Sequence, residues 1–204
     1  MNKFSKDILY DEDAYYMSCP EVVANYLAEL LKSYKTAVEL CSAIGITVCA
    51  LAKHMDKVYG VEIDSKRIEM AKNNAKLYGV SDKVEFIQGD VLDTNLLKNI
   101  KASVAVLDPD WSVDKNTPKI HSNSLANTTP NAIELFNKVK ENITSNLVIR
   151  VSKNVSFNDL KELGVCHVYN IIYDGRIRFK YALYLDNIKE YKEIDTDLGD
   201  LSYL

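Results

Sequence analysis

The chain has 204 residues, of which 47% are apolar and 26% charged, and this is the composition of one globular domain rather than of a disordered segment. The formal net charge of −4 argues against a strongly basic nucleic-acid-binding surface, and no apolar run has the length of a membrane span. The cysteines and histidines lack the spacing of a metal site or a disulfide framework. We therefore expect a cytoplasmic protein with no membrane association and no bound metal.

Short β-branched runs alternate with amphipathic helical segments along most of the chain, beginning with a helix opened by Pro20-Glu21. The strands are expected at Ala37–Cys41, Lys57–Ile63, Lys83–Gln88, Ser103–Asp108, Asn146–Val151, Val165–Tyr173 and Arg176–Leu185. Helices are expected between them, after Gly45, after Asp64, near Leu96, from Pro130, and from Asn158 to Leu163. This alternation predicts an α/β fold with a mostly parallel seven-stranded sheet covered by helices on both faces.

Three local signals support these element boundaries. Asp64-Ser65 can cap a helix that Gly79 ends, and Asp174-Gly175 is a turn typical of a C-terminal antiparallel hairpin. The segment from Asp110 to Thr129 is polar and shows no periodicity. Loops of this length in compact domains are usually functional or mobile.

Polar residues stand at the ends of the first three expected strands. A turn of sequence Glu39-Leu40-Cys41-Ser42-Ala43-Ile44-Gly45 follows the first strand, Glu62 ends the second, and Asp90 ends the third. In a Rossmann-like sheet these positions can seat a polar cofactor tail, hold ribose hydroxyls and accept a bond from an adenine amine. Each acid alone could be a helix cap or a solvated strand end. Three strand ends in register with a fourth acidic strand end at Asp108 predict an S-adenosylmethionine site, formed by Glu39, Cys41, Ala43, Gly45, Glu62, Ile63, Asp90 and Val91. A nicotinamide site is less favoured because the first turn lacks a full GxGxxG.

The fourth strand ends in Asp108-Pro109-Asp110-Trp111, which contains the only tryptophan of the chain. A carboxylate and a carbonyl freed from the sheet can accept N–H bonds from a ring-borne amine, and an indole can stack on the ring. The segment is thus a candidate site for amine methylation, with Asp108, Pro109 and Trp111 as catalytic residues. The alternative interpretation is a strand that ends in a proline turn, with Trp111 merely packed.

Several blocks resemble the trimethylguanosine synthase family, the RNA cap guanine-N2 methyltransferases and their prokaryotic relatives. The likeness is carried by residues 11–21 (DEDAYYMSCPE), 61–64 (VEID), 71–80 (AKNNAKLYGV), 84–90 (VEFIQGD), 136–146 and 152–154 (SKN). The resemblance implies a Rossmann-like S-adenosylmethionine-dependent methyltransferase fold. It also implies RNA as the substrate, with Asp110, Trp111 and Asn154 in contact with it.

The chain departs from the family pattern at six positions. Ala43 and Ile46 stand where glycine is expected, and Cys19 replaces the threonine of the leader. Asp110 replaces the second proline of Pro-Pro-Trp, and Ser112 and Val113 replace the glycines expected after it. An isoleucine in the cofactor turn is harder to accommodate than an alanine, and Asp110 adds a charge beside the reacting centre.

The expected organisation has three parts. Residues 1–35 form an N-terminal leader and a helix that packs on the cofactor site, and residues 36–186 form the methyltransferase domain. Residues 187–204 form an acidic tail with two lysines against five acidic residues, which we expect to be a solvated end that is dispensable for folding.

The expected function is S-adenosylmethionine-dependent methylation of an exocyclic base amine of RNA, by resemblance guanine N2. Two alternatives stay open. One is a methyltransferase fold that binds a nucleotide or a partner without turnover, and the other is a methyltransferase for a small-molecule or protein amine.

Overall fold

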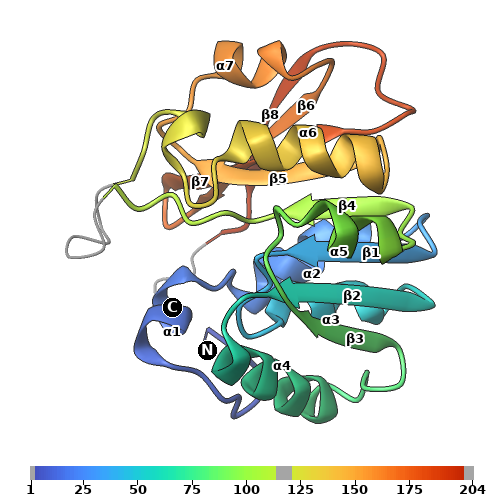
Figure 1. The fold of residues 1–204 in the computed structure, drawn as a ribbon. Coiled ribbons are helices and arrows are strands. Elements are labelled where there is room, and N and C mark those ends of the chain that lie inside the picture. The colour runs from blue at the N-terminus through green and yellow to red at the C-terminus, as the bar shows by residue number, and fades with distance from the viewer. Residues whose placement is uncertain (1–2, 114–120, 200–204) are drawn as a thin grey trace. The chain divides into compact units, whose positions relative to one another are not determined.

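The computed structural model describes residues 3–113 and 121–199, so residues 114–120 of the long polar loop lie outside the described part. The chain divides into two compact units, the first ending at Ala105 and the second beginning at Val106 (Figure 1). Each unit is described by itself below. The described ranges contain eight strands rather than the predicted seven, because a strand forms in the acidic tail.

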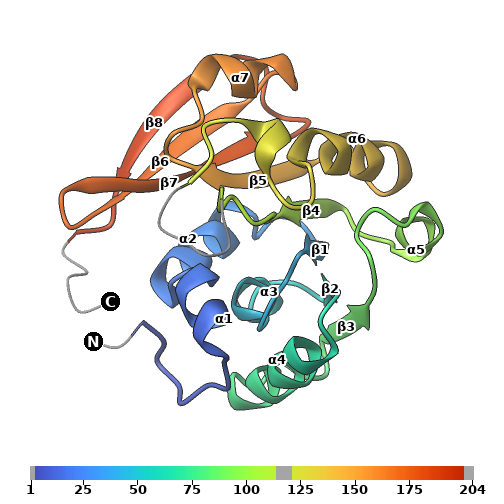
Figure 2. The same ribbon diagram turned by 60° about the vertical axis from the view of Figure 1, so that its left-hand side comes forward.

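The first unit holds three parallel strands in the order β3-β2-β1, namely β1 (Thr36–Leu40), β2 (Lys57–Glu62) and β3 (Val84–Gln88). Helices cover both faces of these strands (Figure 2). One face is covered by α2 (Glu21–Leu30), α3 (Ile46–Ala52) and α4 (Ser65–Leu77), which pack together through α3, and the other by α5 (Thr94–Asn99). The strand ends therefore lie in register at one edge, as the sequence predicts.

Helix ends in the first unit follow the local chemistry of the sequence. The Asp64 carboxylate accepts bonds from the backbone N–H groups of Lys66 and Arg67 at the start of α4, and Gly79 follows its end at φ +70°. A short helix that the sequence analysis did not predict, α1 (Glu12–Met17), lies in the leader and is capped by Asp11.

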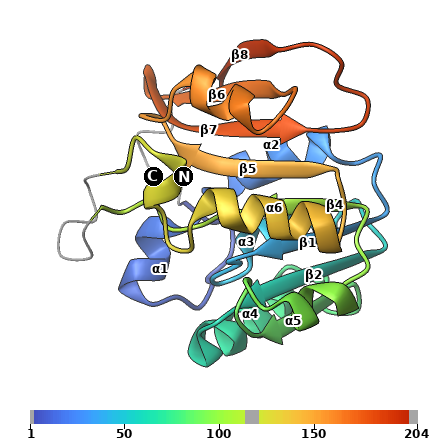
Figure 3. The same ribbon diagram turned by 45° about the horizontal axis from the view of Figure 1, so that its top comes forward.

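The boundary between the units falls within the sequence of β4 (Val104–Leu107), and the second unit is built on four later strands in the order β5-β7-β6-β8 (Figure 3). They are β5 (Leu147–Ser152), β6 (His167–Tyr173), β7 (Arg176–Tyr184) and β8 (Lys192–Asp197). The helix α6 (Ala132–Asn142) precedes β5, and α7 (Phe157–Glu162) connects β5 to β6. β7 is antiparallel to β5 and β6. The predicted hairpin is confirmed, with both turn residues, Asp174 and Gly175, at positive φ.

The acidic tail is not the solvated end that the sequence analysis expects. Lys192–Asp197 forms β8 and pairs in parallel with β6. The buried Asn170 of β6 donates from Nδ2 to Glu193 Oε1 at 3.1 Å and to Asp195 Oδ1 at 2.8 Å. Most side chains of β8 are exposed, which explains why the segment lacks the apolar pattern of a strand.

The described part of the long polar loop is partly ordered by short-range pairing. Asp110 pairs with Thr129 and Ser112 pairs with His121 as isolated bridges, and a 3₁₀ turn, η1, spans Leu125–Asn127. The helix that follows begins at Ala132 with Asn131 as its cap, two residues later than Pro130. No helix within the described ranges is long and apolar enough to cross a membrane, and no metal-ligating cluster is found there.

Candidate functional site

Three residues of the turn after β1 have the left-handed backbone conformation that glycine favours, although only one of them is a glycine. Cys41, Ala43 and Gly45 have φ values of +66°, +44° and +77°. Left-handed non-glycine residues are costly and persist where the surroundings fix them, often at functional sites. Ile46 is instead the first residue of α3 and is buried, so its side chain packs inside the unit and does not obstruct the turn.

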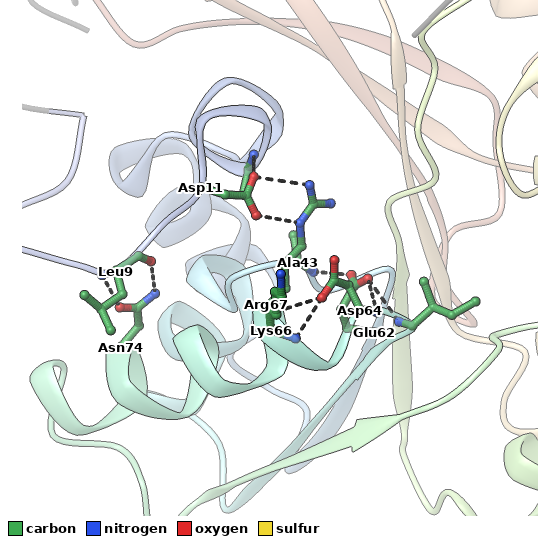
Figure 4. Close-up of polar contacts among 10 residues, drawn as sticks. Leu9, Asp11, Ala43, Glu62, Asp64, Lys66, Arg67 and Asn74 are labelled. Carbon is green, nitrogen blue, oxygen red and sulfur yellow. Dashed lines mark hydrogen bonds and ion pairs between the residues drawn. The ribbon is translucent and has the colours of Figure 1, made fainter.

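Glu62 holds this turn from the end of the neighbouring strand (Figure 4). Its Oε2 accepts a bond from Ala43 N at 2.8 Å, and its Oε1 accepts bonds from Ile63 N and Asp64 N, both at 3.0 Å. The side chain is buried, with the residue 6% exposed. A carboxylate has about four acceptor sites, so these three bonds leave capacity for about one more. Glu62 is expected from the sequence to bind ribose hydroxyls, but its role in fixing the turn has no signal in the sequence.

The other predicted cofactor residues of the first unit differ in exposure. Ile63 is 67% exposed although it is large and apolar, and Asp90 is exposed, with its Oδ1 accepting from Leu92 N at 2.8 Å. Val91 and Glu39 are buried, the latter within β1.

The Cys49 thiol lies near Glu39. Burial is the largest cause that raises the pKa of this thiol to about 12, and the negative charge of Glu39 is the second.

These residues fit the adenosine half of S-adenosylmethionine. The exposed Ile63 side chain offers an apolar surface for an adenine ring, and the Asp90 carboxylate keeps acceptor capacity for an amine. Glu62 can accept about one ribose hydroxyl bond beside its three backbone bonds. The strained turn supplies the close backbone approach that a glycine-rich turn gives in other nucleotide-binding folds.

The leader is tied to this turn by contacts that span more than fifty residues (Figure 4). The fully buried Asn74 of α4 accepts a bond from Leu9 N at 2.8 Å and donates to Leu9 O at 2.9 Å and Ile44 O at 3.0 Å. Asp11 forms an ion pair with Arg67, at 2.9 Å between Oδ2 and Nε. Asn74 therefore connects the leader, α4 and the cofactor turn.

In the second unit, Asp108 is paired with an arginine that the sequence analysis did not single out. Arg150 of β5 donates from Nη1 to Asp108 Oδ2 at 2.6 Å, and the two side chains are 6% and 16% exposed. Burial raises the pKa of the Asp108 carboxyl to about 6, while the Arg150 charge opposes this and the Asp110 charge adds to it. The carboxyl is thus mostly ionised at neutral pH.

Trp111 lies among aromatic and cationic groups of the same unit. The guanidinium carbon of Arg150 lies 5.2 Å from the centre of its indole and 4.8 Å from the centre of the Phe179 ring. The His121 ring lies 5.1 Å from Trp111, tilted by 31°, and Phe179 meets the indole edge-on at 6.1 Å. Trp111 is half-buried rather than part of the closed core, so the interpretation of a merely packed residue is incomplete.

The other predicted substrate residues are close to this cluster. The Asp110 Oδ1 accepts bonds from Ser112 N at 2.9 Å and Oγ at 2.6 Å, so its carboxylate stabilises the turn after Trp111. Asn154 is exposed and donates from Nδ2 to His121 O at 3.0 Å. A polar pocket of about 650 Å³ is lined by Val113, His121, Ser122, Asn123, Asn127 and Asn154.

Comparison with known proteins identifies the family of the chain. A family model described as RNA cap guanine-N2 methyltransferase matches residues 34–187. The trimethylguanosine synthase of Schizosaccharomyces pombe is 28% identical over 186 residues, which cover 85% of this chain and 77% of the yeast protein.

Solved structures share the fold at low sequence identity. A candidate methyltransferase from Porphyromonas gingivalis W83 is 17% identical with a TM-score of 0.72, and the match covers 87% of this chain but 43% of that one. TrmK from M. capricolum, solved with S-adenosyl-homocysteine, is 14% identical with a TM-score of 0.57, covering 86% of this chain and 71% of that one. The predicted Rossmann-like methyltransferase fold and its cofactor are confirmed. The chain is an S-adenosylmethionine-dependent methyltransferase and belongs to the RNA cap guanine-N2 methyltransferase family.

Proposed function

We propose that the chain methylates an exocyclic base amine of RNA, at guanine N2. The observation that carries this proposal is the half-buried Asp108 carboxylate, which directly follows a strand end and is paired with Arg150, next to the half-buried indole of Trp111. The family description adds guanine N2 as the acceptor atom, and the yeast relative is named as a trimethylguanosine synthase.

The residues of the first unit hold the cofactor in this proposal. Glu62 binds a ribose hydroxyl, Asp90 binds the adenine amine, and Ile63 covers the adenine ring. The turn from Cys41 to Gly45 holds the polar tail of the cofactor through its backbone. When bound, S-adenosylmethionine supplies an activated methyl group on a sulfonium, so the protein mainly has to position the acceptor and complement its charge.

The residues of the second unit hold the acceptor. Asp108 Oδ1 and the Pro109 carbonyl accept the two N–H bonds of the amine, which turns its lone pair away from them and toward the methyl group. Trp111 stacks on the base, as aromatic side chains do in proteins that bind single-stranded RNA. The nitrogen becomes cationic as it is methylated, and its proton passes to Asp108, whose pKa of about 6 suits this acceptor role.

The direct test is product analysis. The protein is incubated with S-adenosylmethionine carrying a tritiated methyl group and with total RNA, and the RNA is digested to nucleosides. We expect the label in N2-methylguanosine. Label in another nucleoside would contradict the assignment of the base, and label in protein or small molecules would favour a different amine as acceptor. A protein that binds the cofactor in calorimetry but labels nothing would be a binding module rather than an enzyme.

A further inference from the structure

Asp108 is proposed to accept a hydrogen bond from the substrate amine, yet within the described ranges its carboxylate already accepts one from another protein side chain. Arg150 Nη1 donates to Oδ2 at 2.6 Å, and in the described part of the chain the Asp108 side chain accepts from this residue alone. The two carboxylate oxygens are therefore not equivalent. Oδ2 is engaged by the arginine, and Oδ1 keeps its acceptor capacity for a substrate N–H.

Arg150 is itself buried and packed against aromatic rings. It projects from β5, every residue of which is buried, and its side chain is 6% exposed. Its guanidinium lies against two rings, 4.8 Å from the centre of Phe179 and 5.2 Å from the centre of Trp111. Such cation–π contacts add attraction when the cation is desolvated and restrict its orientation. An arginine also stays protonated at any pH at which the protein is folded.

The charges around Asp108 oppose each other. Arg150 from β5 favours the ionised carboxyl, whereas burial and Asp110 from the adjoining loop favour the protonated form. Phe179 of β7 and Trp111 contribute no charge. A protonated Asp108 keeps a carbonyl oxygen that can accept an N–H bond, but it cannot take up the proton that the methylated amine releases. The Arg150 charge therefore favours the ionised form of Asp108 in the site.

We propose that Arg150 is a positioning residue for methyl transfer, which keeps Asp108 ionised and fixes its Oδ2 so that Oδ1 receives the amine. This inference rests on the proposed function. Arg150 acts through Asp108 and need not touch the substrate. It also couples the acceptor to Trp111, because the same guanidinium contacts both side chains.

The test follows the titration of Asp108 in two ways, by ¹³C NMR of its carboxyl carbon, assigned with Asp108→Asn, and by the pH dependence of methyl transfer. In the parent both should show a midpoint near the pKa of about 6. Arg150→Gln removes the cation, so the pKa rises, and the acid limb of the rate profile should move up by about 1–3 pH units. Transfer should recover at higher pH, which a merely structural role would not produce.

Arg178 offers a matched control in the same unit. Its Nη2 pairs with Asp174 Oδ2 at 2.5 Å, and its guanidinium lies 4.7 Å from the centre of the Tyr173 ring. Arg178→Gln should leave the Asp108 midpoint unchanged. Arg150→Lys keeps the charge on a stem without the planar fork, so its midpoint should lie between those of the parent and Arg150→Gln. It also keeps the test available if the Gln variant does not fold.

An Asp108 midpoint that stays at the parent value in Arg150→Gln or Arg150→Lys would overturn the inference. So would a loss of rate that is the same at every pH. The NMR titration needs no substrate, so its result separates this inference from the proposed function. A parent that transfers no methyl group to RNA would contradict the function, whereas an unshifted midpoint in an active parent series would contradict the positioning role alone.

Discussion

The Glu62 carboxylate stabilises the turn after β1 and is also proposed to bind the cofactor. Its three bonds to backbone N–H groups satisfy donors at the end of β2 and in the strained turn after β1. The bond to Ala43 N links it to a left-handed alanine, a conformation that an isolated chain would avoid. In the family pattern a glycine stands at this position. We infer that Glu62 compensates here for the missing glycine.

Replacing Glu62 by glutamine should weaken S-adenosylmethionine binding by at least about tenfold, because charge-assisted bonds contribute about 1.5–3 kcal/mol each. The glutamine side chain also places its NH₂ donor where a carboxylate oxygen accepted a backbone N–H, so the turn after β1 should be less stable. Calorimetry measures the affinity and a thermal melt confirms folding. Glu69→Gln is the matched control, since Glu69 is an exposed carboxylate of the first unit that pairs with Lys72. Equal affinity in the two variants would mean that Glu62 is only a structural residue.

At the scale of elements, the leader is a part of the cofactor unit rather than an extension of it. Asn74 reaches both Leu9 and Ile44, and the Asp11–Arg67 pair anchors the start of α1 to α4. A fully buried amide with three bonds to backbone groups is costly to remove, because each group left unpaired loses its partner without regaining water.

Asn74→Ala should therefore destabilise the protein by about 2–3 kcal/mol, which lowers the melting temperature by about 4–12 °C in a domain of this size. Asn73→Ala, one residue earlier on the same helix, is the control and should change the melting temperature little. Calorimetry should also show weaker cofactor binding in Asn74→Ala, since Ile44 belongs to the turn. Identical melts for the two variants would contradict a clamping role.

β8 changes the expectation for the acidic tail. Ending the chain at Tyr191 removes the strand and takes both acceptors, Glu193 and Asp195, from the buried Asn170 amide. We expect a clear loss of melting temperature relative to a chain that ends at Gly199, which keeps the whole of β8. If both truncated chains melt like the parent, β8 is dispensable and the interpretation as a solvated end was right.

At the scale of the whole molecule, the sequence predicts those features that depend on local chemistry. The Asp64 cap, the Gly79 helix end and the Asp174-Gly175 hairpin each follow from a few adjacent residues, and all three are confirmed. β2 ends at Glu62 and β4 ends at Leu107, directly before Asp108, and at both places the apolar run stops. The cofactor follows from the polar residues at the strand ends of the first unit, and the family follows from the resemblance of whole blocks.

The features that the sequence analysis missed depend on distant partners. Arg150 interrupts an apolar run and gives no sign that Asp108, 42 residues earlier, compensates its charge. Asn74 and Leu9 are 65 residues apart. β8 pairs through its backbone and exposes most of its side chains, so its charged sequence resembles that of a disordered end. Pairing across such distances has no short-range signal.

The proposed cofactor residues all belong to the first unit and the proposed acceptor residues all belong to the second. Methyl transfer requires both sets, but cofactor binding requires only the first. Variants of the second unit should therefore separate the two activities. Trp111→Ala should weaken RNA binding or turnover through the loss of about 1–3 kcal/mol of stacking, and it should bind S-adenosylmethionine like the parent.

The most direct measurement is methyl transfer to guanine N2 of RNA by the parent and by Asp108→Asn, each saturated with S-adenosylmethionine. The asparagine keeps the shape of the side chain but carries no negative charge and can present an N–H donor to the amine. We expect N2-methylguanosine from the parent, a rate at least about 100-fold lower for Asp108→Asn, and equal cofactor affinity for the two. An Asp108→Asn protein that methylates guanine N2 as fast as the parent, at equal cofactor occupancy, would contradict it.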